Sequence, residues 1–482
     1  MQNPVNVPLN DAVLALAFVG DLSMGQPTDH SLRTARLASS LAAEAGGSIP
    51  DRVAASQVAL LRWSGCTANA SGFEQLLGDD VAGRDAMLTL TLPAFDGQAR
   101  AGILPLAQIH CEVSGDIASM LGLGAEVEAG LRNVFEAYDG NGMPGRIGHP
   151  HVPPVVYHVA LASDLEILSR AHGIDTALAY IAGFANARYP AALVALVSQH
   201  AKAWLEALES APLLAEIAAL PGHGATEVAL PLVGDVIDLK LPWLAGHSRQ
   251  VAELAKVSAA MQGFDADLQN CLYRAGLIHG VGRAALPNRL WNNPGRLQAS
   301  DWERVRLMPY WTFRAARHFR QLGAEAELAS YAYERLDGSG YYRGLAGDAL
   351  SGAQRTLAVS TAWVALRSRR PWRAAHSYDD AAVLLRSEAA QGRFDGQIVE
   401  ATLAAARGDK VRALPSRSSV SLSERETEVL RQISLGESNK EVARTLAISP
   451  STVRTHVENI FRKLECSTRA AATLKAFTLG LL

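Results

Sequence analysis

The feature that most constrains the fold of this 482-residue chain is a series of helix-start signals in residues 420–482. Two serines are each followed three residues later by a glutamate, the pattern of a capping box; the pairs are Ser423 with Glu426 and Ser438 with Glu441. Ser449 predicts a third start, with Pro450 in a first turn where a missing N–H costs nothing. Ser467 can cap a fourth helix. Four short helices are therefore predicted.

The third predicted helix has two distinct faces. Its apolar residues follow helical spacing and should lie in the core; they are Val453, Val457, Ile460 and Leu464. A second face carries Arg454, Thr455 and Glu458. Two short helices joined by a tight turn, the second with a polar outer face, predict a helix-turn-helix, whose second helix enters the major groove of DNA.

Residues 420–482 closely resemble the LuxR-type DNA-binding domain, through the SNKE turn, the SPSTVRTHV helix start and the IFRKL ending. The resemblance implies binding to double-stranded DNA as a homodimer. It implies that Arg454, Thr455 and Glu458 face the bases, and that four residues lie nearer the phosphates, namely Lys440, Thr452, Asn459 and Lys463. The family often has a basic residue where Glu458 stands. An ordinary solvated face is therefore the alternative for Glu458 and Asn459.

Residues 241–406 have a helical pattern, and several of their segments resemble an HD-GYP domain, the family of cyclic di-GMP phosphodiesterases. These segments include HSRQVAELA at 247–255, GLIHGVGR at 276–283 and YERLDGSGYYRG at 333–344. The resemblance implies a hydrolytic site in which several His and Asp side chains hold two or three metal ions, which activate water and bind phosphate oxygens.

Most of the metal-ligand positions that the resemblance implies have been replaced. His247 and His279 are retained, but Gly280 stands where the family has the aspartate after the second histidine. The other replacements are Met308, Ala332, Tyr333 and Thr361 at ligand positions, Tyr342 at the signature proline and Arg283 at the usual lysine. Two imidazoles without a carboxylate do not supply the oxygen ligands that Mg²⁺ and Mn²⁺ need. We therefore predict no metal, no cofactor and no catalysis here. A weak transition-metal site and packed core histidines are the two alternatives for His247 and His279.

The segment LDGSGYYRG retains the composition of a tight loop, with Gly338 and Gly340 at positions that favour a positive φ. Three arginines near it are candidates for holding an anionic ligand; they are Arg335, Arg343 and Arg370. The alternative is that these arginines are structural and face solvent.

The first part of the chain parallels the second. Four segments recur in the same order at offsets of 217, 216, 198 and 205 residues, beginning with DHSLRT at 29–34 and GHSRQV at 246–251. In this copy His30 corresponds to His247, while the replaced positions hold Trp63, Ser64, Val134 and Phe135, and Asp164 lies near the final aspartate. His149, His151 and His158 have a spacing that suggests a metal, but neighbouring prolines and the lack of matching acids favour loop and core histidines.

Charge is distributed unevenly along the chain. Residues 1–240 carry 12 Lys and Arg against 25 Asp and Glu, so the remaining residues carry 33 against 23. A polyanion would be repelled by the first half and tolerated by the second. The four cysteines form no CxxC pair, and no uninterrupted apolar run is long enough to span a membrane. A cytoplasmic protein with no membrane association is predicted.

The predicted fold class is all-α, with two HD-domain-like helical bundles in tandem and a C-terminal four-helix helix-turn-helix domain. The predicted boundaries are 1–225 and 226–406 for the two bundles, 407–419 for a linker and 420–482 for the DNA-binding domain. The predicted function is a transcriptional regulator whose inactive HD-GYP-like domains act as a sensor, ligand-binding or dimerisation module, with a nucleotide-like effector or a protein as partner. The alternative is a metal-dependent cyclic dinucleotide phosphodiesterase with an appended DNA-binding domain.

Overall fold

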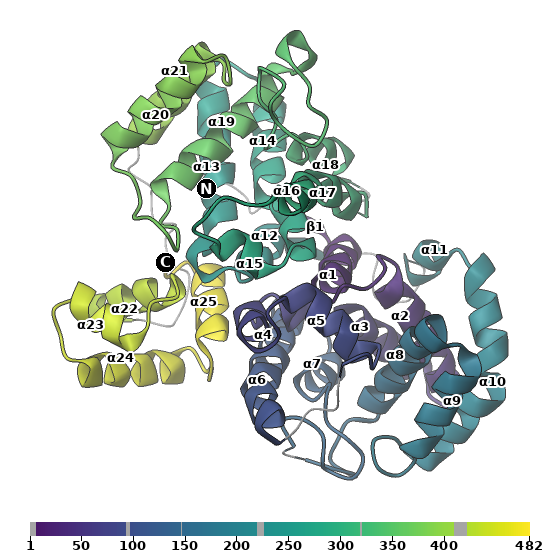
Figure 1. Ribbon diagram of the computed structural model, residues 1–482. Helices are drawn as coiled ribbons and strands as arrows, with labels where there is room; N and C mark the ends of the chain where they lie inside the picture. Colours follow the sequence, from purple (N-terminus) through teal and green to yellow (C-terminus); the bar gives the residue numbers. More distant parts are fainter. Residues whose placement is uncertain (1–5, 93–96, 146, 219–225, 319–320, 409–421) are drawn as a thin grey trace. The chain divides into compact units, whose positions relative to one another are not determined.

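The computed structural model describes residues 6–92, 97–145, 147–218, 226–318, 321–408 and 422–482. The chain divides into two compact units, Val7–Val228 and a second made mainly of Ala229–Leu482. Apart from strands β1 (Asn6–Pro8) and β2 (Glu227–Ala229), which pair into a two-stranded sheet, the regular elements of the described residues are helices (Figure 1). The predicted all-α class is confirmed.

The first unit is a helical bundle in which α2 packs against α3 and α8. Its helices are α1 (Leu9–Ser23), α2 (His30–Glu44), α3 (Ile49–Leu61), η1 (Ser64–Cys66), α4 (Ala70–Leu77), α5 (Asp80–Leu88), α6 (Gly97–Met120), α7 (Ala125–Arg132), α8 (Pro154–His172), α9 (Ile174–Gly183), α10 (Ala191–Ser210) and α11 (Leu213–Ala218).

In the second unit, α13 packs against α12, α14, α19 and α21. The helices of this bundle are α12 (Pro231–Asp238), η2 (Pro242–Leu244), α13 (His247–Met261), α14 (Ala266–Ile278), η3 (Val281–Ala285), α15 (Asn288–Asn292), α16 (Ala299–Arg306), α17 (Met308–Ala316), α18 (Gly323–Ala329), η4 (Gly347–Ala349), α19 (Gly352–Arg367), α20 (Tyr378–Ala390) and α21 (Gly396–Arg407).

The last four helices are those predicted from the capping pattern: α22 (Glu424–Ser434), α23 (Asn439–Thr445), α24 (Pro450–Lys463) and α25 (Arg469–Thr478). Both capping boxes are present, and Ser449 accepts a hydrogen bond from the Thr452 amide. The cap of α25 is Thr468 rather than Ser467, because the Thr468 side chain reaches the Ala471 amide. The four apolar residues predicted to face inward are buried, three of them in α24 and the fourth, Leu464, at its C-cap. Of the predicted linker, only Arg407 and Gly408 lie within the described residues, and Arg407 ends α21.

Matching hydrogen bonds occur at corresponding places in the two units. The amide of Ser31 donates to Asp21 Oδ2 over 3.1 Å, and the amide of Ser248 donates to Asp238 Oδ2 over 2.7 Å. In both cases the serine hydroxyl donates to the other carboxylate oxygen. The pairs are separated by 217 residues, the offset that the sequence segments showed. Asp21 therefore links α1 to the start of α2, which begins at His30. In the same way, Asp238 links α12 to the start of α13, which begins at His247.

Candidate functional site

His247 and His279 lie together in the second unit. His247 begins α13, His279 follows the last turn of α14, and their ring centroids are 5.5 Å apart. They are 3% and 0% exposed. We call these two residues, with Gly280, Arg283 and Tyr333, the histidine cluster.

Arg283 occupies the centre of the histidine cluster. Its Nη2 donates to His279 Nε2 over 3.2 Å and to the Tyr333 hydroxyl over 2.8 Å. The other ring nitrogen of His279, Nδ1, lies 2.6 Å from the Gly276 carbonyl oxygen, to which it donates. His279 Nε2 is therefore the acceptor. The lone pair that would bind a metal ion instead receives a hydrogen bond from Arg283.

Gly280 makes room for this guanidinium. A Cβ atom placed on Gly280 would lie 2.2 Å from Arg283 Nη1, far inside a van der Waals contact. The backbone of Gly280 has an ordinary φ of −88°, so chain conformation does not require glycine there. The Arg283 side chain thus fills the space into which a residue-280 side chain would project.

The other replaced positions supply no metal ligand. Met308, Ala332 and Thr361 are buried, and the Thr361 hydroxyl donates to the Leu357 carbonyl within its own helix. Burial and the charge of Arg283 lower the pKa of His279 to about 3, which reflects how poorly this site accepts further positive charge. No group of three metal-ligating side chains occurs among the described residues. The side chains of the histidine cluster do not fit a metal ion.

A buried carboxyl group lies beside the cluster. Asp238 Oδ1 is 3.8 Å from Arg283 Nη1, and both side chains are almost fully buried. Burial raises the pKa of Asp238 to about 7, although the charge of Arg283 and the hydrogen bonds from Ser248 act in the opposite direction.

The three arginines suggested as anion ligands lie in different surroundings. Arg335 packs over the Phe394 ring at 4.5 Å, and Arg343 packs over the Tyr331 and Tyr342 rings at 4.2 and 4.4 Å. Arg370 packs over Trp243 at 4.3 Å. Burial and the charge of Arg283 lower the pKa of Arg370 to about 10. The charge of Arg283 therefore acts on Arg370.

The signature-like loop is a tight turn, as predicted. The Ser339 amide donates to Asp337 Oδ1 over 2.9 Å, and Gly338 has a φ of +79°. The prediction of a positive φ for Gly340 is wrong. Glycine is needed there because a Cβ would lie 2.2 Å from the Arg335 amide nitrogen.

In the first unit, His30 forms a buried hydrogen bond with a carboxylate that the sequence analysis did not identify. Its Nδ1 lies 2.6 Å from Glu166 Oε2, and both side chains are 1% exposed. Burial opposes ionisation of Glu166, but hydrogen bonds and charges from His30 and Arg170 lower its pKa to about 2. Asp164 instead accepts a hydrogen bond from the Tyr189 hydroxyl and forms an ion pair with Arg188.

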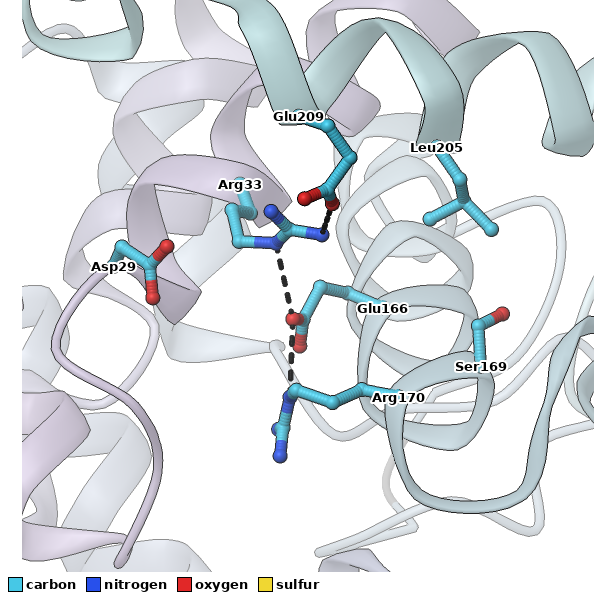
Figure 2. A pocket seen from close by; sticks show the side chains of 7 residues that line it. All are labelled: Asp29, Arg33, Glu166, Ser169, Arg170, Leu205 and Glu209. Atoms are coloured by element: carbon cyan, nitrogen blue, oxygen red, sulfur yellow. Dashed lines mark hydrogen bonds and ion pairs between the residues drawn. The ribbon is translucent and has the colours of Figure 1, made fainter.

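A pocket of about 400 Å³ opens beside this pair (Figure 2). Arg33 contacts Glu166 and Glu209 over 3.3 and 3.0 Å, and Arg170 contacts Glu166 over 3.2 Å. Both arginines are therefore neutralised by carboxylates, with Asp29 also in the lining. This charge balance does not favour an anionic ligand.

His110 is a further histidine that the sequence analysis missed. The Gly65 amide donates to Ser114 Oγ over 3.0 Å, just as the Gly282 amide donates to Thr312 Oγ1 over 3.0 Å in the second unit. Since His110 precedes Ser114 by four residues, it occupies the place that Met308 holds in the second unit. The correspondence between His110 and Met308 is hard to see in the sequence because the offset between the units changes. It is 217 residues for Gly65 and Gly282 but 198 residues for Ser114 and Thr312.

The remaining histidines and the replaced positions of the first unit form no metal site among the described residues. His149 stacks on Tyr138 with centroids 4.6 Å apart, His151 is exposed, and burial lowers the pKa of His158 to about 4. The replaced positions are buried or packed together; they are Trp63, Ser64, Val134 and Phe135.

Helix α24 presents the side chains predicted to contact DNA bases. Arg454 and Glu458 are 77% and 62% exposed and form an ion pair of 2.9 Å with each other, and Thr455 is exposed beside them. Of the predicted phosphate contacts, Lys440 and Thr452 are exposed, Asn459 is half-buried, and Lys463 is half-buried with its ammonium 2.7 Å from Glu426. The contacts of these residues with DNA bases and with phosphates remain predictions. The described residues contain no helix that is long and apolar enough to cross a membrane.

Comparisons with known proteins identify the domains that carry these residues. Residues 231–398 match the HD domain family, and residues 420–476 match the family of bacterial regulatory proteins of the luxR type. A 3'3'-cGAMP-specific phosphodiesterase of Vibrio cholerae is 25% identical over 418 residues, covering 78% of this chain and 90% of the relative. A nitrate/nitrite response regulator homolog of Haemophilus influenzae is 51% identical over 57 residues, covering 12% and 27%.

The fold of a solved structure is also similar. The crystal structure of a cyclic GMP-AMP-specific phosphodiesterase of Vibrio cholerae aligns with a TM-score of 0.60 at 22% identity, covering 84% of this chain and 98% of that one. This agreement extends the likeness in fold well beyond the HD match. The chain therefore contains an HD domain, related to cyclic dinucleotide phosphodiesterases, followed by a DNA-binding domain of the luxR family.

Proposed function

We propose that this chain is a transcriptional regulator in which the HD domain does not hydrolyse a substrate but senses a nucleotide-like effector or a protein partner. The DNA-binding domain supplies the output. The first unit is a second HD-like bundle that arose by duplication, as the matching Asp21–Ser31 and Asp238–Ser248 hydrogen bonds suggest. In this proposal the protein acts as a homodimer.

The observation that carries the loss of catalysis is the position of Arg283. Its guanidinium fills the space beside Gly280 and uses the metal-binding lone pair of His279. Metal-dependent hydrolysis requires ions that activate water and clamp phosphate oxygens. A fixed positive charge where those ions would lie opposes their binding and leaves the water without activation.

The second candidate function is a metal-dependent phosphodiesterase with an appended DNA-binding domain. It is favoured by the relative named as a 3'3'-cGAMP-specific phosphodiesterase, which this chain matches over 90% of its length. Incubating the full chain with 3'3'-cGAMP or cyclic di-GMP and Mn²⁺, Mg²⁺ or Fe²⁺ separates the two candidates. We expect intact substrate, with the Vibrio cholerae enzyme as the positive control. Turnover that disappears in His279→Ala would establish the enzyme instead.

A further inference from the structure

Three buried polar atoms near the histidine cluster have no hydrogen-bond partner. They are His247 Nδ1, Arg283 Nη1 and Arg370 Nη1. The His247 and Arg283 side chains are 3% and 4% exposed, whereas Arg370 is only half-buried. Leaving buried donors unpaired is costly, and the positive charge of Arg283 repels that of Arg370. The carboxylate of Asp238 lies 3.8 Å from Arg283 Nη1, which is too far for a hydrogen bond.

Guanidinium groups in pairs are well suited to phosphate. Each offers several N–H donors in a planar fork, and a phosphate group offers several acceptor oxygens with a negative charge. An anion between Arg283 and Arg370 would satisfy the unpaired donors and relieve their repulsion. Because the Arg283 side chain is 4% exposed and Arg370 only half-buried, Arg370 is the side chain that would move to admit the anion.

This segment and its stacking partner both touch the DNA-binding domain. Arg369, next to Arg370, forms an ion pair of 2.9 Å with Glu437. Pro242, next to Trp243, lies so close to Gly436 that a Cβ on that glycine would be 2.6 Å from Pro242 Cβ. The two residues flanking the Arg370–Trp243 stack thus contact adjacent residues of the turn between α22 and α23.

A second contact lies at the start of α13. Phe477 of α25 approaches Gly246, so that a Cβ there would be 2.9 Å from Phe477 Cε1. Gly246 immediately precedes His247 in the chain. The side chains of α24 that are predicted to contact bases remain exposed, so these contacts do not cover the recognition surface.

Building on the proposed regulator function, we propose that Arg283 and Arg370 bind a phosphate-bearing small molecule without metal, and that the Arg370–Trp243 stack transmits its binding to the DNA-binding domain. Binding of the anion draws Arg370 from Trp243. The flanking contacts of Arg369 and Pro242 with the Gly436–Glu437 turn then change. Linkage requires that the anion alter DNA affinity by the same factor by which DNA alters affinity for the anion.

The first test is calorimetric titration of the full chain in EDTA with inorganic pyrophosphate and with 3'3'-cGAMP. At least one probe should bind, and Arg370→Met should weaken it about tenfold or more, since hydrogen bonds to charged groups are the strong ones. Arg386→Met is the matched control, because Arg386 is an exposed arginine paired with Glu400 elsewhere in the same domain. No binding of either probe to the unaltered chain, or equal affinity in Arg370→Met, would overturn the site.

The second test is DNA affinity of the full chain with and without the bound probe. The probe should change the affinity of the unaltered chain, and Arg369→Ala should abolish this change while retaining probe binding. An effect of undiminished size in Arg369→Ala would overturn the transmission route. DNA binding without any probe is measured separately, and its absence would count against the regulator function itself rather than against the anion site.

Discussion

Replacing Gly280 by alanine should destabilise the HD domain through Arg283 alone. The new Cβ would lie 2.2 Å from Arg283 Nη1, so the guanidinium must leave its place. It would then lose one or both of its hydrogen bonds, to His279 Nε2 and to the Tyr333 hydroxyl. A hydrogen bond from a charged group contributes about 1.5–3 kcal/mol, so the free energy of unfolding should fall by about 2 kcal/mol.

The assay is urea denaturation of the full chain followed by circular dichroism, with a double-mutant cycle. In the Arg283→Ala background the clash is gone, so Gly280→Ala should cost almost nothing, and the cycle should give a coupling free energy of about 2 kcal/mol. Gly396→Ala is the control, because nothing lies within 4 Å of a Cβ placed there and Gly396 begins α21. Additive effects of the two substitutions, or a Gly280→Ala variant as stable as the control, would refute the reasoning.

Three further predictions concern DNA binding and pH. Arg454→Ala should cost about 1–3 kcal/mol of binding and relax preference at one base pair per half-site, measured by anisotropy on a panel of duplexes. Lys463→Ala should weaken all sequences alike and lower the salt slope by about 1, although part of its effect will be the lost ion pair with Glu426. The pKa of Asp238 is raised from an ordinary 3.8 to about 7 in the folded chain. The free energy of unfolding should therefore fall as the pH rises from about 4 to about 7, by at most about 1.4 kcal/mol per pH unit. Asp238→Asn should flatten this slope, and an unchanged slope would contradict the assignment.

The DNA-binding domain could be predicted from the sequence nearly in full. Its helices are short and start at side chains that cap the amides of their own first turn, so the signal is local. The capping boxes and the buried face of α24 were therefore confirmed, and the error at the start of α25 was one residue, from Ser467 to Thr468. The exposure of Arg454 follows from helical periodicity, but its ion pair with Glu458 did not enter the prediction.

The prediction that Gly280 stands where the HD-GYP family has an aspartate also came from the sequence, because it requires only a comparison of motifs. What fills the vacated space was decided by the tertiary structure. Arg283 reaches His279 and Tyr333, 50 residues further along the chain, because α14, η3 and the residues after α18 meet at one place. The hydrogen bond between His30 and Glu166 likewise joins residues that are 136 positions apart in the chain and that only helix packing brings together.

The three candidate arginines show most clearly what could not be predicted from the sequence. On the sequence, Arg335, Arg343 and Arg370 were equivalent cations near one loop. In the folded chain all three pack on aromatic rings, and of the three only Arg370 carries an unpaired, buried N–H whose surroundings include Arg283. Local sequence fixes where a helix begins because capping acts over one turn. Which distant charges share a buried site depends on how the helices pack, which no short stretch of the chain encodes.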